Sequence, residues 1–251
     1  MRLDTTPAGF HAMVLSANPT VFIDPVHPGD AGHYASHIKR RATGSENAID
    51  GAFICEFEED TAIAAEIDRL IEERAASPQR ASGEELRTYR AAIACTGEYA
   101  SKHGGTVSGA MSGITTSLNR VTGIYEREIS VRMELIATND LIVYTNGSTD
   151  PYTNGNGVAM LGQNQSNVDS VIGSANYDIG HVFSTGGGGI ANLGCVCRSN
   201  YKARGVTGSN NPSGDLFDVD YVAHEMGHQF GGSHTFNGTS GGCSGNRTAS
   251  S

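Results

Sequence analysis

The alternation of apolar and polar positions divides the chain into two parts. The first 45 residues contain short apolar runs broken by prolines and turn residues, which is typical of strands and turns. Residues 61–76 then repeat apolar side chains at helical spacing, and residues 77–85, SPQRASGEE, have the composition of a linker. We therefore expect a small β-rich N-terminal region over residues 1–80 and a second domain over residues 81–251.

From residue 86 onward, segments with strand patterns alternate with segments with helix patterns. Residues 86–100 suit a buried strand, residues 107–128 have a helical rhythm, and residues 132–144 indicate one strand, or two with a turn at Asn139. A short helix over residues 167–178 and a strand over residues 179–185 follow. This order predicts an α/β (α+β) domain with a mixed twisted sheet.

Composition and charge narrow the classes of protein. Hydrophobic residues make up 38% and charged residues 18% of the chain, as in a soluble globular protein. The net charge of −10 gives no electrostatic reason to bind nucleic acid. No apolar run reaches the roughly 18 residues of a membrane span, so we expect no such span. The oligomeric state stays open.

The segment HEMGHQFGGSH, residues 224–234, concentrates candidate metal ligands. On a helix, His224 and His228 lie one turn apart on one face and can bind one ion together. Glu225 points elsewhere and can reach a water on that ion, which is why H-E-x-x-H is the signature of zinc hydrolases. Gly231 stands where the helix should end, since glycine adopts the left-handed conformation that turns a chain. That turn would bring in His234, and three imidazoles plus a water form an open, catalytic Zn²⁺ site.

Other side chains near this segment have simpler interpretations. Asp215, Asp218 and Asp220 precede the predicted helix, where carboxylates cap free N–H groups and favour the positive end of the helix dipole. His103 and His181 are expected to be ordinary, partly buried histidines, because three ligands already suffice.

The spacing His224-Glu225-x-x-His228-x-x-Gly231-x-x-His234 resembles the metzincin zinc endopeptidase consensus. Residues 184–199, STGGGGIANLGCVCRS, resemble the strand and cysteine that precede the zinc helix in reprolysin/adamalysin-like members. Residues 234–238, HTFNG, resemble bacterial secreted members and also pappalysin-type peptidases, although Thr235 stands where reprolysins proper often carry Asp. The resemblance covers roughly residues 86–251 and implies a secreted, metzincin-like zinc endopeptidase that acts on protein or peptide substrates.

The resemblance also implies roles for further residues. Glu225 would be the general base. The substrate would add as a strand to the sheet edge formed by Gly189, Ile190, Ala191, Asn192 and Leu193. Residues 1–80 weakly resemble the propeptide-like region before such domains. The chain is expected to stop before the methionine turn that lies below the metal in metzincins, which would leave the domain C-terminally incomplete.

Several alternatives remain open from the sequence. Cys197 and Cys243 form a candidate disulfide, and Cys55 is either a buried thiol or a zinc-blocking latency device. Residues 150–157, DPYTNGNG, form either a turn or a Ca²⁺ site. The chain could also be a catalytically inactive zinc-containing binding module, or a zinc hydrolase of a non-peptide amide.

Overall fold

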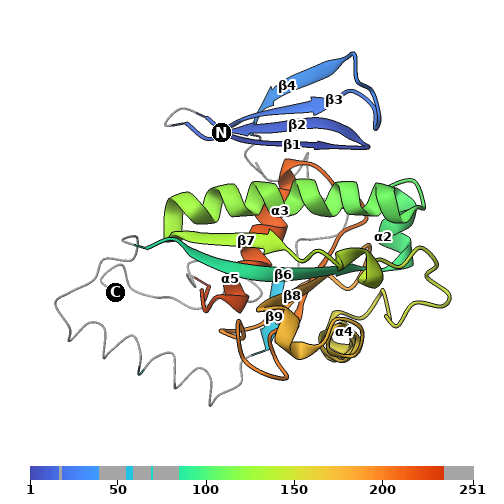
Figure 1. The fold of residues 1–251 in the computed structure, drawn as a ribbon, viewed down its shortest axis with the longest axis vertical. Helices are drawn as coiled ribbons and strands as arrows, with labels where there is room; N and C mark the ends of the chain where they lie inside the picture. The colour runs from blue at the N-terminus through green and yellow to red at the C-terminus, as the bar shows by residue number, and fades with distance from the viewer. Residues whose placement is uncertain (17–18, 40–54, 59–68, 70–84, 235–251) are drawn as a thin grey trace.

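The structure is a computed structural model of the 251-residue chain and describes residues 1–16, 19–39, 55–58, 69 and 85–234. Within these residues the strands form two sheets (Figure 1). The first has the order β1-β2-β3-β4, and the second has the order β5-β9-β10-β8-β6-β7. Among the described residues, no helix combines the length and the hydropathy that crossing a membrane would require.

The first sheet is an antiparallel meander, which confirms the expectation of a β-rich N-terminus. Its strands are β1 (Arg2–Thr6), β2 (Gly9–Val14), β3 (Val21–Pro25) and β4 (Tyr34–Ile38). The helix expected over residues 61–76 lies outside the described residues, apart from residue 69.

The second sheet is mixed, as the sequence predicts. Its strands are β5 (Cys55–Glu58), β6 (Arg87–Cys95), β7 (Val131–Leu135), β8 (Ile179–Ser184), β9 (Gly189–Asn192) and β10 (Gly205–Gly208). Neighbouring strands are parallel except for β9, which runs antiparallel to β10. β5 pairs with β9, so a segment from the predicted N-terminal region extends the edge of this sheet.

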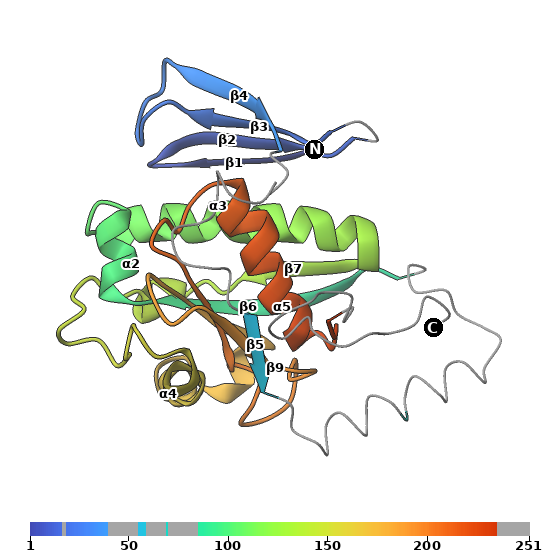
Figure 2. The same ribbon diagram turned by 180° about the vertical axis from the view of Figure 1, so that it is seen from behind.

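Helices cover both faces of the second sheet (Figures 1 and 2). They are α2 (Gly97–Lys102), α3 (Val107–Ile129), the 3-10 helix η1 (Asn139–Ile142), α4 (Gly157–Val171), the 3-10 helix η2 (Ser174–Asn176), the π-helix η3 (Leu216–Val222) and α5 (Ala223–Gln229). α2, α3, η3 and α5 pack on one face, and α4 packs on the other. The result is a three-layer α/β domain that carries α5 against β9 and β10.

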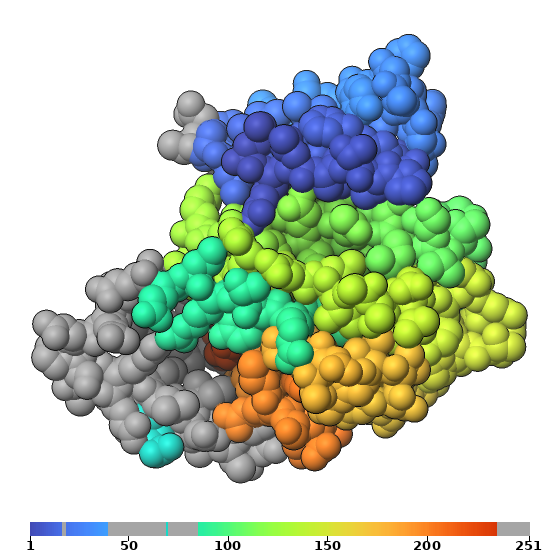
Figure 3. Space-filling view, viewed as in Figure 1, coloured from blue at the N-terminus to red at the C-terminus, as the bar shows by residue number. Residues whose placement is uncertain are grey.

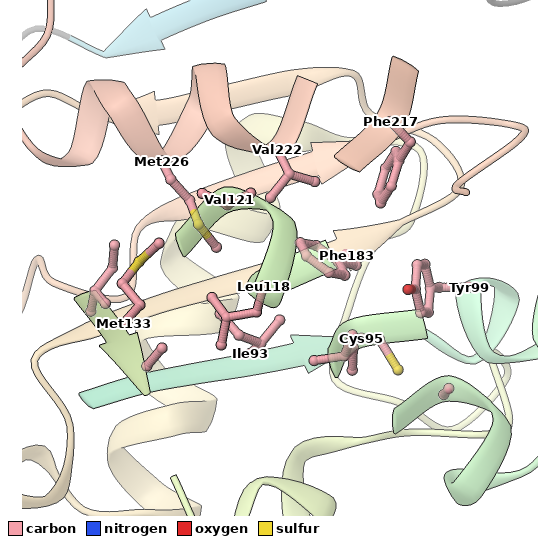
Figure 4. Packing of buried hydrophobic residues seen from close by; sticks show 14 of the residues in the cluster. Ile93, Cys95, Tyr99, Leu118, Val121, Met133, Phe183, Phe217, Val222 and Met226 are labelled. Atoms are coloured by element: carbon pink, nitrogen blue, oxygen red, sulfur yellow. The ribbon is translucent and has the colours of Figure 1, made fainter. Parts of the chain in front are cut away.

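The central strand β6 shows how the sequence builds both cores. Its residues alternate between the two faces, so Ala91, Ile93 and Cys95 join the cluster below α3 while Ala92 and Ala94 join the cluster below α4. Met226, Val222 and Phe217 add to the first cluster from α5 and η3, and Leu118 and Val121 add to it from α3 (Figure 4). The helix that carries the candidate ligands therefore rests on the main apolar core.

Three predicted elements differ from the structure. The strand expected over residues 86–100 ends at Cys95, because Thr96 accepts a hydrogen bond from the N–H of Tyr99 and caps α2. The helix expected over residues 167–178 begins at Gly157 and ends at Val171, because Asn156 accepts a hydrogen bond from the N–H of Ala159 and caps an earlier start. The glycines and asparagines around residue 155 conceal that start in the sequence. The strand predicted from residue 132 ends at Leu135 as β7, and η1 begins at Asn139, where the sequence left a turn open, because the buried Asn139 side chain bonds the N–H and C=O of Ile93, at 2.7 Å and 2.8 Å. The second strand of that alternative is reduced to an isolated bridge between Val143 and Cys95.

The N-terminal sheet forms a layer of its own on top of α3 (Figures 1 and 3). Polar contacts join the two: Thr116 and Asn119 of α3 both donate to the carboxylate of Asp4, at 2.8 Å and 3.0 Å. Arg120, which is only 3% exposed, contacts Asp24 of β3 and, at 2.9 Å, Asp218 of η3. A cavity of about 570 Å³ lies beside this arginine between the two layers.

Candidate metal centre

The helix expected over the histidine segment is present, but it begins differently from the prediction. The π-helix η3 runs directly into α5, and Asp215 makes no side-chain capping bond. Asp218 is buried and accepts hydrogen bonds from Ser117 at 2.5 Å and Arg120 at 2.9 Å. The expectation that the aspartates cap the zinc helix is therefore wrong for these two: Asp218 binds α3, and η3 continues the helix on the N-terminal side of α5.

The three predicted ligands converge on one point. The Nε2 atoms of His224 and His228 lie 3.0 Å apart, those of His228 and His234 3.1 Å apart, and those of His224 and His234 3.2 Å apart. Two nitrogens that share a tetrahedral zinc ion lie about 3.3 Å apart, given a Zn–N distance of about 2.0–2.1 Å. Among the described residues, this is the group of His, Cys, Asp and Glu side chains whose spacing suits a metal ion.

Gly231 makes the turn that brings in His234. Its φ of +96° is a conformation that other L-residues rarely adopt. The N–H of Gly231 donates to the carbonyl of His228, and the N–H of Gly232 donates to that of Gly227, both at 2.9 Å. These bonds satisfy the last carbonyls of α5 and reverse the chain, so the third imidazole approaches from outside the helix.

Hydrogen bonding and burial prepare the imidazoles as ligands. His228 Nδ1 lies 2.6 Å from the carbonyl oxygen of Gly232, so Nδ1 carries the proton and Nε2 offers its lone pair to the centre. Burial, together with the neighbouring His228 and His234, lowers the pKa of His224 to about 4. Burial also lowers the pKa of His228. Both rings are therefore neutral at pH 7, as metal binding requires.

Glu225 lies fully buried on the face of α5 that meets the sheet. Gly189 of β9 provides the space, because a Cβ there would lie 2.2 Å from Glu225 Oε1 and 2.3 Å from Tyr221 Cε2. The carboxylate of Glu225 is thus confined between its own helix and the strand predicted to bind substrate. On α3, Tyr125 donates a 2.6 Å hydrogen bond to the carbonyl of Ala223 at the start of α5.

The predicted substrate-binding segment is strand β9 and the residue after it. Gly189, Ile190, Ala191, Asn192 and Leu193 are all buried. One side of β9 pairs with β10, where the N–H of Asn192 donates to the carbonyl of Arg204 at 2.9 Å. Because N–H groups alternate along a strand, that of Ala191 points to the other side. Residues 55–58 lie on that side as β5, with Phe57 opposite Ala191.

The remaining candidate residues do not join the histidines. Cys197 is exposed with a φ of +63°, while Cys243 lies outside the described residues, so the predicted disulfide stays a prediction. Cys55 pairs through its backbone with Gly189, and its side chain is outside the described part. Asp150 accepts hydrogen bonds from the N–H groups of Gly97 and Tyr152, at 2.7 Å and 3.0 Å, as in a turn. The alternative of a Ca²⁺ site gains no support.

Residues 111–235 match the model of a family described as the reprolysin-like metallopeptidases of family M12B. The chain is a reprolysin-like metzincin. The matched region runs from α3 to one residue beyond His234 and so contains all three imidazoles, Glu225 and β9. Reprolysin-like peptidases depend on zinc and act on proteins or peptides, which agrees with the histidine geometry. No curated protein matches the chain.

Sequence reasoning did not foresee a contact between two buried side chains at the end of α5. Gln229, next to the candidate ligand His228, forms a hydrogen bond with His181 of β8, and both are fully buried. His181 was expected to be an ordinary, partly buried histidine. The position of Gln229, four residues after Glu225, places it on the same helix face and is the one sequence signal that could have indicated a sheet contact.

Proposed function

We propose that this chain is a zinc-dependent endopeptidase in which Glu225 acts as the general base. The observation that supports it is the mutual spacing of three imidazole nitrogens, 3.0–3.2 Å, beside a buried glutamate. His224, His228 and His234 would hold one Zn²⁺. When bound, such an ion lowers the pKa of a water molecule and polarises the carbonyl of the scissile bond.

Residues of the chain itself would move the proton and hold the ligands in position. Glu225 accepts the proton of the attacking water on its carboxylate and passes it to the nitrogen of the leaving amine. Gly189 leaves free the space that this carboxylate occupies, because a Cβ at that position would collide with it. The hydrogen bond from His228 Nδ1 to Gly232 holds one ligand ring in the required tautomer.

We propose that the substrate adds as a strand to the outer side of β9, along Gly189–Leu193. The predicted direction of the N–H of Ala191, away from β10, supports this edge as the docking site. In the structure, β5 pairs with that side of β9, so a substrate strand must displace residues 55–58.

The same pairing supports the division into a propeptide-like region over residues 1–80 and a peptidase domain over residues 81–251. β5 covers the edge, and the N-terminal sheet docks on α3 through polar contacts beside a cavity. We propose that the protein is secreted, as reprolysin-like peptidases typically are. The peptidase would then be latent until the N-terminal region is removed from the β9 edge.

The pairing of β5 with β9 also favours a second candidate, an inactive module that binds zinc. A third candidate, a hydrolase of non-peptide amides, has no observation in its favour. The decisive test measures zinc content and cleavage of casein and of fluorogenic peptides, with and without a chelator. A chain that binds one zinc ion and cleaves neither substrate after removal of its N-terminal region would contradict the proposal.

Glu225→Gln tests the role of the general base. The variant should bind zinc as the wild type does, because Glu225 is not a ligand, and its turnover should fall by about 10²–10⁴-fold. Zinc stoichiometry and peptide hydrolysis measured on the same preparation separate the two effects. Wild-type turnover by this variant would show that Glu225 is not the base.

A further inference from the structure

A second polar group lies on another face of α5 from the metal centre, where the helix meets the sheet. His181 of β8, Thr207 of β10 and Gln229 of α5 are all fully buried. His181 Nδ1 lies 2.7 Å from Gln229 Oε1, and His181 Nε2 lies 2.8 Å from Thr207 Oγ1. Gln229 Nε2 donates to the carbonyl of Gly180 at 2.9 Å and to Cys195 Sγ at 3.5 Å.

These contacts fix the proton positions. The amide nitrogen of Gln229 donates to Gly180, so its oxygen faces His181 and must accept a hydrogen bond. His181 therefore carries its proton on Nδ1, and its Nε2 accepts from the hydroxyl of Thr207. Burial lowers the pKa of His181 to about 4, which keeps the ring neutral in this role. Each polar atom of the trio has a partner, as buried polar groups require.

The position of Gln229 on α5 connects these contacts to the metal centre. Residues four apart share a helix face, so His224 and His228 form one stripe while Glu225 and Gln229 form another. The first stripe faces the metal centre, and the second faces the sheet. A rotation of α5 that moved Gln229 would move Glu225 and both ligands together.

The sheet packs closely around the side-chain amide of Gln229. A Cβ at Gly205 of β10 would lie 2.3 Å from Gln229 Oε1 and 2.4 Å from His181 Nδ1, so the glycine leaves the room that this hydrogen bond fills. The backbone adds two bonds at the same end of α5. The N–H of Gly194 donates to the carbonyl of His228 at 2.9 Å, and that of Val196 donates to the carbonyl of Gln229 at 3.2 Å.

We propose that His181 is a positioning residue for the peptidase reaction, acting through Gln229 to set the rotation of the zinc helix. The inference rests on the proposed function. The hydrogen bond between His181 and Gln229 would act on the positions of His224 and His228. Its effect is therefore a change in metal geometry, which can be measured without turnover.

The test compares His181→Leu with His181→Asn in the full chain. Leucine removes the donor to Gln229, whereas asparagine can present an N–H close to the place of Nδ1. His181→Leu should bind Zn²⁺ about 10-fold more weakly, and its Co²⁺-substituted form should show an altered visible spectrum. His181→Asn should restore most of both. If the wild type cleaves peptides, His181→Leu should lower kcat by about 10-fold with little change in KM, because β9 is untouched.

Controls separate positioning from loss of stability. Val182→Ala, on the opposite face of the same strand, should lower the melting temperature and leave the Zn²⁺ affinity and the Co²⁺ spectrum unchanged. Gln229→Met removes the same hydrogen bond from the helix side and serves if His181→Leu does not fold. The double variant His181→Leu/Gln229→Met should lose no more Zn²⁺ affinity than either single variant.

Wild-type metal affinity and Co²⁺ spectrum in a folded His181→Leu or Gln229→Met would overturn the proposal. Additive losses of affinity in the double variant would overturn it as well. A wild-type chain that binds zinc and cleaves no peptide would contradict the proposed function and leave these metal measurements valid.

Discussion

At the scale of single residues, the centre depends on positions where a side chain is absent as much as on those where one is present. Gly189 leaves room for Glu225, and Gly205 leaves room for the contact between His181 and Gln229. Gly231 supplies the positive φ that turns the chain toward His234. Of the three, only Gly231 was predicted from its spacing to the ligands, because the other two act through neighbours that are distant in sequence.

Gly189→Ala should separate metal binding from turnover. The new Cβ would lie 2.2 Å from Glu225 Oε1, so the carboxylate must move. We expect unchanged zinc content and a loss of peptidase turnover of about 100-fold, as for a misplaced catalytic group. Gly162→Ala in α4 is the control: its Cβ would meet nothing within 4 Å, and alanine should stabilise the helix by about 1 kcal/mol. Equal activity in both variants would argue against the confined glutamate.

His181 should make the free energy of unfolding depend on pH. Burial lowers its pKa from 6.5 to about 4, so below pH 6.5 the unfolded chain binds the proton more tightly than the folded one. Its contribution is complete above pH 6.5 and declines as the pH falls toward 4. Between pH 7 and pH 5 the wild type should lose about 2 kcal/mol more than His181→Asn in urea unfolding with chelator present. Parallel losses in the two proteins would refute this assignment.

At the scale of elements, the apolar pattern predicts the strands and helices whose faces are buried on a regular period. β6, α3 and β8 follow their patterns, because each packs apolar residues against a continuous core. η1 and the start of α4 depend instead on single asparagine side chains, Asn139 and Asn156, which replace backbone bonds. Propensity cannot foresee such contacts, since their partners are set by the tertiary fold.

The pairing of β5 with β9 gives a prediction for latency. Glu56→Pro/Phe57→Pro places prolines at adjacent positions, so one of them removes an N–H that points to β9. The double variant should cleave fluorogenic peptides faster than the wild type at equal zinc content. Ala191→Pro on β9 is the counterpart and should raise KM or abolish cleavage, because it removes a donor from the substrate edge itself. Unchanged kinetics in both variants would exclude this edge as the docking site.

At the scale of the whole molecule, an ion-pair network connects the N-terminal sheet with two elements of the helix layer below it, α3 and η3. Arg120 of α3 contacts Asp24 in the N-terminal sheet and Asp218 in the π-helix that leads into α5. Lys39, just beyond β4, adds a 2.6 Å ion pair with Asp220 of the same π-helix. The N-terminal region thus contacts the π-helix that leads into the helix of the candidate metal ligands. Nothing in the sequence pairs these residues, which lie about a hundred positions or more apart.

Arg120→Met should therefore strongly lower the free energy of unfolding. It leaves Asp24 and the buried Asp218 without their cation, and breaking such a pair typically costs about 3–5 kcal/mol. Arg127→Met, which breaks an exposed ion pair with Glu128 on the same helix, should cost less than about 1 kcal/mol. Chemical denaturation of the two variants in parallel measures the difference. Similar small losses would mean that Arg120 is compensated by solvent.

The π-helix between Asp215 and α5 has a consequence for chain length. A π-helix contains more residues per turn than an α-helix, so removing one residue from Leu216–Val222 would let this stretch continue α5 in regular α geometry. The residues before the deletion would then swing by about 100° around the axis, and Asp218 would leave Arg120. A homologue one residue shorter here should keep its three histidines yet lack either this aspartate or the arginine on α3.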